Sequence, residues 1–327
     1  MATTEKMNMI QAINRALHDA MEADATVLAL GEEVADPEGG GIVGVTKGLS
    51  ERFGETRVLS TPISEQAIIG SAVGAAIGGY RPVAELMLMN FSTVAMDMLV
   101  NHAAKLRFMS GGQTNVPIVV RTATGSGLGT GGQHCDFLEA WFAHTAGMKV
   151  VIPSNPSDAY GLMRSAIEDD DPVIFVENIP IYFTPTETTL EKIPLGKAKV
   201  VREGTDLTIV AYALMVHHAL AVAAELEAEG KSVEVIDLRT IAPWDRETVL
   251  ASVAKTGRLM VVHEAVKEHG VGAEIASVVN EELFGKLKAP VKRLGASFCP
   301  VPFSKPLETA FVPNPATIGE AARAILA

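Results

Sequence analysis

Short apolar runs alternate with helix-like stretches along the first half of the chain. Runs such as TVLALG, RPVAELML and PVIFVEN have the length and apolar content of buried strands. The stretches between them are long enough to form helices, and several are amphipathic or rich in small residues. Alternation of this kind is typical of a parallel sheet covered by helices on both faces. The pattern therefore predicts an α/β domain.

The individual elements of this domain can be assigned from the same pattern. It predicts an amphipathic helix within 1–27, a strand and loop over 26–34, a helix over 65–78, a strand over 81–88, a long helix over 91–112 that a Gly pair stops, a strand over 116–125, a helix over 136–147, a strand over 148–154, a helix over 156–171 and a strand over 172–178.

The rhythm breaks in a Pro- and Thr-rich passage at about 180–194 and then restarts. Strands are expected over 206–213, 232–240 and 258–265, and helices over 215–230, 245–257 and 270–285. We therefore expect two α/β domains, each a mainly parallel sheet with helices on both faces. The expected boundaries are 1–185 for the first domain, 186–200 for the linker and 201–327 for the smaller second domain.

Composition excludes several classes of protein. The chain has 327 residues, of which 48% are hydrophobic, and this is enough for two cores. Its formal net charge of −12 argues against a nucleic-acid partner. Cys135 and Cys299 form no disulfide framework and fit a reducing cytoplasm. The N-terminus has no signal-peptide pattern, and no apolar run has the length of a membrane span.

A single carboxylate, Glu65, begins the helix predicted over 65–78. Gly70, Gly74 and Gly78 follow at a spacing of four residues, which aligns them along one face of a helix. Such a face lets another backbone approach closely, so we expect Glu65 to lie where elements pack tightly and little water enters. A carboxylate in that position is either a helix cap or a chemical group of a functional site.

The segment TATGSGLGTGGQH contains a formal G-x-G-x-x-G at Gly127, Gly129 and Gly132. A dinucleotide site should have an acidic residue at the end of the next strand, but that strand ends in Ser154 and Asn155. The segment is therefore interpreted as a loop near some ligand. It ends in His134, which follows a strand of a parallel sheet, the place where such sheets bind ligands.

Other polar residues suggest weaker hypotheses. The acidic turn from Glu168 to Val173 is either a solvated helix end or a site for a hard cation. His217 and His218 begin a helix of the second domain and are interpreted as ordinary, partly buried residues. Glu32 and Glu33 follow a strand and could face the same cleft as Glu65.

Taken together, these residues identify a family resemblance. The chain resembles the β subunit of the thiamine-diphosphate-dependent E1 component of 2-oxo acid dehydrogenase complexes, with pyruvate and acetoin dehydrogenases as the nearest types. The resemblance spans nearly the whole length and implies a transketolase-like pyrimidine-binding domain and a transketolase-like C-terminal domain. The segments that carry it include GEEVA, GVTKGL, TPISEQ, VGAAIGGYRPVAELM, NHAAKLRFMSGG, GGQH, AWFAHTAGMKVVIPS, DDPVIFVEN, VIDLRTIAPWD and GVGAEI.

The resemblance assigns a role to several residues. Glu65 matches the glutamate that hydrogen-bonds N1′ of the aminopyrimidine ring of thiamine diphosphate, and Met87 and Phe91 match the pyrimidine pocket. His134 matches a histidine linked to the transfer of the acyl group to lipoamide. Glu32 or Glu33, with Glu33 as the cofactor-binding choice, corresponds to an acidic relay between paired active sites.

The resemblance also implies ions and partner chains. A structural monovalent cation, K⁺ or Na⁺, is implied at the positions Ile118, Ala166, Ile167, Asp169 and Asp171. No GDG motif for the diphosphate and Mg²⁺ occurs in the chain. The resemblance therefore assigns Mg²⁺ mainly to a separate α subunit, in a heterotetramer of two α and two β chains (α2β2), and implies an E2 acyltransferase with a lipoyl domain as a further partner. Alone, the chain should be inactive.

One departure from the family leaves alternatives open. Relatives usually have QHSQ where this chain has QHCD at 133–136, and the added acid should disfavour anionic partners. The main hypothesis is a catalytic β subunit that acts on a 2-oxo acid or acetoin. A second hypothesis is a lipoamide-independent transketolase-like or acyloin-forming enzyme, and a third is a non-catalytic assembly subunit.

Overall fold

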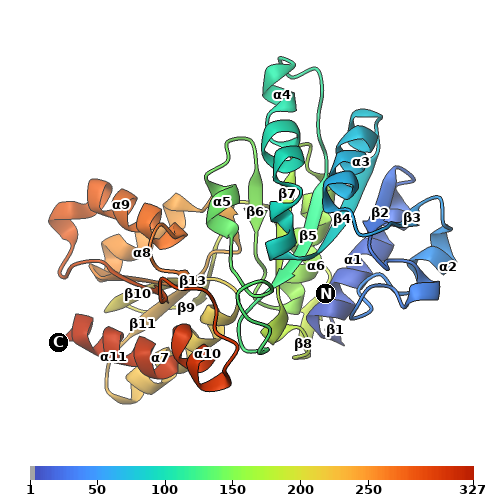
Figure 1. Ribbon diagram of the computed structural model, residues 1–327. Coiled ribbons are helices and arrows are strands. Elements are labelled where there is room, and N and C mark those ends of the chain that lie inside the picture. The colour runs from blue at the N-terminus through green and yellow to red at the C-terminus, as the bar shows by residue number, and fades with distance from the viewer. Residues whose placement is uncertain (1–3) are drawn as a thin grey trace. The chain divides into compact units, whose positions relative to one another are not determined.

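Each of the two units of the chain is built around its own sheet (Figure 1). The computed structural model describes residues 4–327. The first unit contains the residues up to 124 together with 141–195, and the second contains 125–140 together with 196–327. The division at 195–196 lies inside the predicted linker. Residues 125–140, which carry His134, belong to the second unit.

The six strands that the first unit contributes to its main sheet pair in parallel, in the order β6-β7-β5-β4-β2-β3. Its central strands are buried on both faces, and every residue of β7 is buried. The strands are β2 (Val27–Gly31), β3 (Val58–Ser60), β4 (Arg81–Leu88), β5 (Val119–Thr124), β6 (Lys149–Val151) and β7 (Val173–Asn178). This architecture confirms the predicted α/β class.

Two helices of the first unit begin at residues whose side chains bind the free backbone N–H groups of the first turn. Asn8 and Gln11 form a capping box at the start of α1 (Met9–Ala23), and Asn155 caps α6 (Pro156–Glu168). These two helices pack against each other. The unit also contains α2 (Leu49–Phe53), α3 (Glu65–Ile77), α4 (Leu106–Met109), part of the short helix α5 (Glu139–Ala143), and the antiparallel pair β1 (Thr4–Met7) and β8 (Thr186–Thr189).

Three predicted helices differ from the observed ones. The N-terminal helix begins at Met9, because Asn8 caps it and strand β1 precedes it. The helix expected over 136–147 is shortened to α5. The long helix expected over 91–112 is broken into a 3-10 segment (Met89–Thr93), a π-helical segment (Met98–Ala103) and α4. It does end at the Gly pair, whose φ values of 67° and 82° only glycine adopts readily.

The sheet of the second unit has the order β14-β13-β10-β11-β9, with only β9 antiparallel to its neighbour. In Figure 1, α7 and α11 cover one face of this sheet and α8 and α9 cover the other. The elements are β9 (Lys199–Arg202), β10 (Leu207–Ala211), β11 (Val233–Asp237), the short strand β12 (Thr240–Ala242), β13 (Leu259–Val266), β14 (Lys292–Ala296), α7 (Leu214–Ala228), α8 (Arg246–Thr256), α9 (Val271–Leu283), α10 (Lys305–Phe311) and α11 (Pro315–Leu326).

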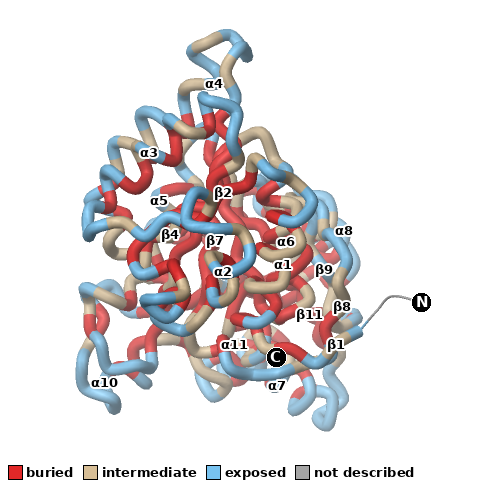
Figure 2. Tube along the Cα trace, turned by 90° about the vertical axis from the view of Figure 1, so that its right-hand side faces the viewer, coloured by how far each residue is buried: buried red, intermediate tan, exposed pale blue. Residues whose placement is uncertain are grey.

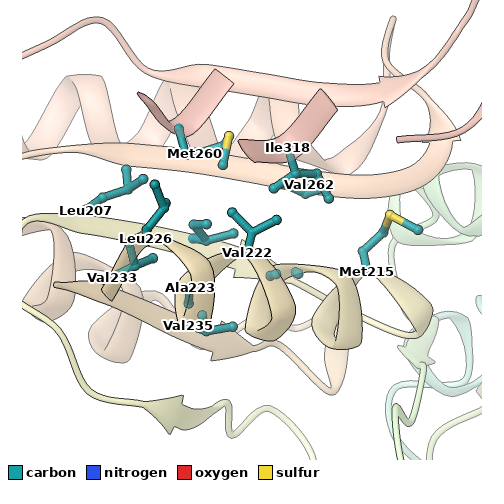
Figure 3. Close-up of a cluster of buried hydrophobic side chains, with 14 of the residues drawn as sticks. Leu207, Met215, Val222, Ala223, Leu226, Val233, Val235, Met260, Val262 and Ile318 are labelled. Carbon is teal, nitrogen blue, oxygen red and sulfur yellow. The ribbon is translucent and has the colours of Figure 1, made fainter. Parts of the chain in front are cut away.

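Aliphatic residues form the core of the second unit. Figure 3 shows side chains of α7, such as Val222 and Leu226, facing Val262 and Met260 of β13 and Ile318 of α11. Figure 2 shows in red that the strands are buried, whereas outer helix surfaces are exposed. Among residues 4–327, no helix combines the length and the apolar character that crossing a bilayer requires.

Candidate active site

Glu65 is the first residue of α3, and its side chain is almost fully buried, with 9% exposure. The preceding residue, Ser64, makes no side-chain cap hydrogen bond. Among residues 4–327 no protein group donates a hydrogen bond to the Glu65 carboxyl. No hydrogen bond therefore supports the interpretation of Glu65 as a helix cap. The N-terminal end of a helix favours a carboxylate. The carboxyl is thus held in a buried place with its oxygens available to a ligand.

Glu32 shares this environment. It follows β2 and is as buried as Glu65, at 9% exposure. Burial raises the pKa of Glu32, and the nearby carboxylates of Glu65, Glu33 and Glu85 raise it further. Glu33 itself is exposed and has a φ of 57°, a left-handed conformation that non-glycine residues rarely adopt. The geometry favours Glu32 over the predicted Glu33 as the carboxyl that acts beside Glu65.

Met87, one of the two residues predicted for the pyrimidine pocket, lines a cavity of about 180 Å³. The other walls come from the loop over 41–45 and from the ends of β4, β5 and β7, at the carboxyl edge where parallel sheets bind ligands. Phe91 lies beyond β4 in the 3-10 segment and is half-buried. Neither Phe91 nor Glu65 is among the residues that line this cavity.

The glycines that follow Glu65 do not pack tightly within the chain, contrary to the prediction. A Cβ on Gly70 would lie 3.4 Å from Sδ of Met98, which is a side chain and not a backbone. A Cβ on Gly74 would meet no heavy atom within 4 Å, and Gly78 approaches only carbonyl groups of its own turn. The described residues therefore leave this face of α3 open.

An ion network crosses the strands and lines the same cavity. Arg121 on β5 donates to Glu85 on β4 at 2.5 Å and, from Nη2, to Glu177 on β7 at 3.0 Å. Its Nε lies 2.8 Å from the Glu177 carboxylate in an ion pair. Tyr182 donates its hydroxyl to Glu177 at 2.6 Å. Burial alone would lower the pKa of Arg121, but the carboxylates of Glu177 and Glu85 raise it well above its usual value. Arg121 therefore stays charged and neutralises two buried acids.

This network was not predicted from the sequence, although a signal was present. Glu85, Arg121 and Glu177 are single charges inside otherwise apolar strands, where a charge is costly unless it is paired. Glu85 lies directly opposite Arg121 in the sheet register, and Glu177 lies opposite Ala123, two residues along the same strand. Strand alternation places all three on one face of the sheet.

The second unit holds His134, which is half-buried, at the end of the glycine-rich segment. The backbone N–H groups of this segment are already bound by carboxylates. Ser126 donates to Glu264 at 2.5 Å and Gly127 donates to Glu308 at 2.6 Å. A nucleotide phosphate would need these same N–H groups. The segment is thus a poor phosphate site, in agreement with the absence of the expected ribose-binding acid.

Cys135, the unusual residue next to His134, is directed into the core. Its side chain is 1% exposed and packs with Ala296, Val301 and Phe311. Its sulfur lies 2.7 Å from the Thr130 hydroxyl, and burial raises the pKa of the thiol. Cys135 is consequently a packing residue that does not face substrate. Asp136 is half-buried, and His217 on α7 is exposed.

A further buried acid, Glu139, lies five residues after His134. Its carboxyl accepts a hydrogen bond from Tyr212 at 2.6 Å, and Tyr212 stacks on the buried His263. Burial raises the pKa of Glu139 from 4.5 to about 7, although the Tyr212 hydroxyl partly offsets the effect. Near neutral pH this carboxyl is therefore partly protonated.

This shift predicts how Glu139→Gln changes stability with pH. The raised pKa means that the folded chain binds more protons than the unfolded chain between pH 4.5 and about 7, so stability is lost as pH rises through this range. Gln does not titrate, so its introduction removes this pH-dependent loss of unfolding free energy, which is on the order of 3 kcal/mol for the pKa shift of Glu139. Urea unfolding should show Glu139→Gln gaining stability over the native chain at about pH 8 relative to about pH 5.

The exposed residue Glu320 provides the matched control. Glu320→Gln should change the free energy of unfolding by the same small amount at both pH values. If the effect of Glu139→Gln on the free energy of unfolding were also the same at both pH values, burial would not raise the pKa of Glu139.

The predicted cation ligands are engaged by basic side chains. Arg81 donates to the carbonyls of Ile167 and Asp169 at 3.1 and 3.0 Å. Asp169 pairs with Lys149 at 2.7 Å and Asp171 pairs with Arg107 at 2.6 Å. The carbonyls of Ile118 and Ala166, the remaining predicted ligands, accept backbone N–H groups of Val173 and Asp169.

A monovalent cation at this place would have to share two carbonyls with the Arg81 guanidinium, which repels it. Among residues 4–327, no cluster of three His, Cys, Asp or Glu side chains is arranged to hold a metal ion. The predicted donors are thus bound by Arg81, Lys149, Arg107 and backbone N–H groups, and the cation stays a prediction.

Comparison with known proteins identifies the family. The transketolase pyrimidine-binding domain matches residues 5–182, and the transketolase C-terminal domain matches residues 196–318. The chain is 45% identical to pyruvate dehydrogenase E1 component subunit beta-2 of Oryza sativa, over 98% of this chain and 87% of that protein. The chain belongs to the E1 β-subunit family.

Bacterial members of the E1 β family are similar over their whole length. The pyruvate dehydrogenase E1 component subunit beta of Bacillus subtilis is 44% identical, over 98% of this chain and 99% of that protein. The beta subunit of acetoin:2,6-dichlorophenolindophenol oxidoreductase of Cupriavidus necator is also 44% identical, over 97% of each chain. These matches confirm the resemblance to 2-oxo acid and acetoin dehydrogenases.

Solved structures share the fold. A split-gene transketolase in an inactive beta4 tetramer superposes with a TM-score of 0.81 at 21% identity, over 98% of this chain and 99% of that one. A transketolase variant from Pichia stipitis gives a TM-score of 0.72 at 16% identity, over 99% of this chain and 47% of that one. At these identities the likeness concerns the fold alone. It confirms the predicted transketolase-like architecture of the E1 β family.

Proposed function

We propose that the chain is a catalytic β subunit that binds the pyrimidine half of thiamine diphosphate and acts with an α subunit on a 2-oxo acid or acetoin. The observation that carries the proposal is Glu65, a buried carboxyl at the start of α3 with no protein hydrogen-bond donor among residues 4–327. A second buried carboxyl, Glu32, lies beside it. A pair of acids is expensive to bury unless a ligand uses it.

The residues fit this cofactor. The Glu65 carboxyl would accept or share a proton at N1′ of the aminopyrimidine ring, and burial would strengthen that hydrogen bond. Met87 and Phe91 would give the ring apolar neighbours. Glu32 would be a second acid near Glu65, with a pKa raised by burial and by the neighbouring carboxylates. When bound, the cofactor supplies a carbon nucleophile and an electron sink for cleaving a bond next to a carbonyl.

His134 would serve the later half of the reaction, the transfer of an acyl group to lipoamide. An imidazole can donate and accept protons near neutral pH, which suits a step in which a thiol forms or is consumed. The departure from QHSQ does not place the thiol of Cys135 beside the imidazole at the surface, because the Cys135 side chain packs in the core.

The partners follow from what the chain lacks. It has no GDG motif for the diphosphate and Mg²⁺. An α subunit would supply that half, in a heterotetramer of two α and two β chains, and an E2 acyltransferase with a lipoyl domain would accept the acyl group. The relatives named as E1 β subunits support an α partner. Cytoplasmic location stays a prediction.

The experiment is reconstitution with an α-type subunit, followed by titration with thiamine diphosphate and Mg²⁺. Circular dichroism of the bound cofactor and 2-oxo acid decarboxylation with an artificial electron acceptor are the readouts. Saturable binding and turnover are expected only when both chains are present. Cofactor binding by this chain alone, or by no pair of chains, would contradict the proposal.

A lipoyl domain separates the proposal from its main alternative. A β subunit of the E1 type should transfer an acyl group to the lipoyl domain in the reconstituted complex. A lipoamide-independent transketolase-like or acyloin-forming enzyme would turn over its substrate without acylating that domain. The measurement is mass spectrometry of the lipoyl domain after incubation with the 2-oxo acid.

A further inference from the structure

The glycine-rich loop, residues 125–134, is fastened at its base by two carboxylates from distant parts of the chain. Glu264 of β13 accepts the N–H of Ser126 at 2.5 Å. Glu308 of α10 accepts the N–H of Gly127 at 2.6 Å and that of Gly129 at 3.1 Å. All of these residues belong to the second unit. The Glu308 carboxylate alone accepts two of the three N–H groups, those of Gly127 and Gly129.

Glu308 is too deeply buried to be a surface contact. Its side chain is 2% exposed, and Glu264 is 4% exposed. A buried carboxylate costs several kcal/mol unless donors compensate for the lost water, and charge-assisted hydrogen bonds to backbone N–H groups do so. Moving the loop away from Glu308 and Glu264 would leave their buried carboxylates without hydrogen-bond donors, which is energetically costly. These two residues therefore hold the loop in place.

Apolar contacts continue the attachment toward His134. A Cβ on Gly131 would lie 2.4 Å from the ring of Phe303, and one on Gly132 would lie 3.1 Å from Cβ of Pro300. On the other side of His134, the Cys135 side chain is buried against Val301 and Phe311. The residues on both sides of His134 are therefore packed against residues in or just before α10.

We propose that Glu308 is a positioning residue for His134. Its carboxylate fixes the backbone at Gly127 and Gly129, and this fixes the direction in which the loop carries the imidazole. The inference rests on the role given to His134 in acyl transfer. A small displacement of a catalytic group lowers rate strongly, so loss of this anchor should act on the step that His134 serves while sparing the chemistry of the Glu65 half.

Hydrogen exchange and two activities test the proposal in the reconstituted complex. In Glu308→Ala, the amides of Gly127 and Gly129 should exchange faster, and acyl transfer to the lipoyl domain should fall by about 10- to 100-fold. Thiamine diphosphate affinity and decarboxylation with an artificial acceptor should stay within about 2-fold of the native complex. Glu308→Gln keeps the shape and one acceptor oxygen, so its loss should be intermediate.

Controls separate the two ways in which this can fail. Glu320→Ala, an exposed substitution in α11, should leave exchange and both activities unchanged. His134→Ala should reproduce the selective loss, and adding Glu308→Ala to it should cause little further loss. If His134→Ala had no effect on acyl transfer, the proposed function of His134 would be wrong.

If His134→Ala impaired transfer but Glu308→Gln did not, the positioning role would be wrong. Equal loss of decarboxylation and acyl transfer in Glu308→Gln would also overturn it, because a general structural defect would be the cause. Glu308→Gln carries the test if Glu308→Ala does not fold.

Discussion

Replacement of Glu65 by Gln should lower the turnover of the reconstituted complex by about 100-fold or more. Gln has the shape of Glu but cannot hold and release a proton, so the variant keeps the packing at the start of α3 and loses the acid. The loss should appear in kcat, whereas cofactor affinity should fall much less, because most contacts to the cofactor remain. The measurement is 2-oxo acid decarboxylation at saturating thiamine diphosphate and Mg²⁺.

Glu274→Gln is the matched control, since Glu274 is an exposed glutamate in the first turn of another helix, α9. It should leave turnover unchanged. Native turnover in Glu65→Gln would refute the assigned chemistry and support the third hypothesis, a non-catalytic assembly subunit.

Replacement of Arg121 by Met should destabilise the chain by about 3–5 kcal/mol, because it leaves Glu85 and Glu177 as buried acids without a counter-charge. The side chain of Glu177 is 1% exposed and that of Glu85 is 14% exposed, so water can solvate Glu85 only in part and Glu177 hardly at all. Thermal unfolding should show a melting temperature lower by about 10 °C. Protonation of the two acids should reduce the defect at low pH.

Arg52→Met is the control, because the Arg52–Glu22 pair is exposed, at 61% and 60% for the two side chains. It should cost less than about 1 kcal/mol. Adding Glu177→Gln to Arg121→Met should recover part of the loss, since one unpaired charge is removed. Equal effects of Arg121→Met and Arg52→Met would mean that the network contributes little to stability.

The apolar runs and their spacing were sufficient to predict the α/β class and most strands. The helix over 65–78 and the six elements expected between 206 and 285 are observed close to their predicted bounds. The segment over 91–112 was predicted less well, because helical periodicity does not distinguish an α-helix from a succession of 3-10, π and α turns.

Residues of the candidate site could be predicted only where the residue type and its local sequence context indicate the chemistry. Glu65 was recognisable as an isolated acid before a run of small residues. The choice between Glu32 and Glu33 was not, because it depends on which of two adjacent side chains turns inward. Glu308 left no signal at all, since its partners are backbone N–H groups far away in the sequence, and any sequence has such groups.

The path of residues 125–140 constrains how the protein can be divided. The chain passes between the two units at 124–125, at 140–141 and at 195–196. A protease that cuts only at 195–196 would therefore yield a C-terminal fragment that lacks part of its own unit. In that fragment Glu308 and Glu264 would lose the backbone donors of the loop, and Val301 and Phe311 would lose the side chain of Cys135. The two units have separate cores but cannot be separated by one cut.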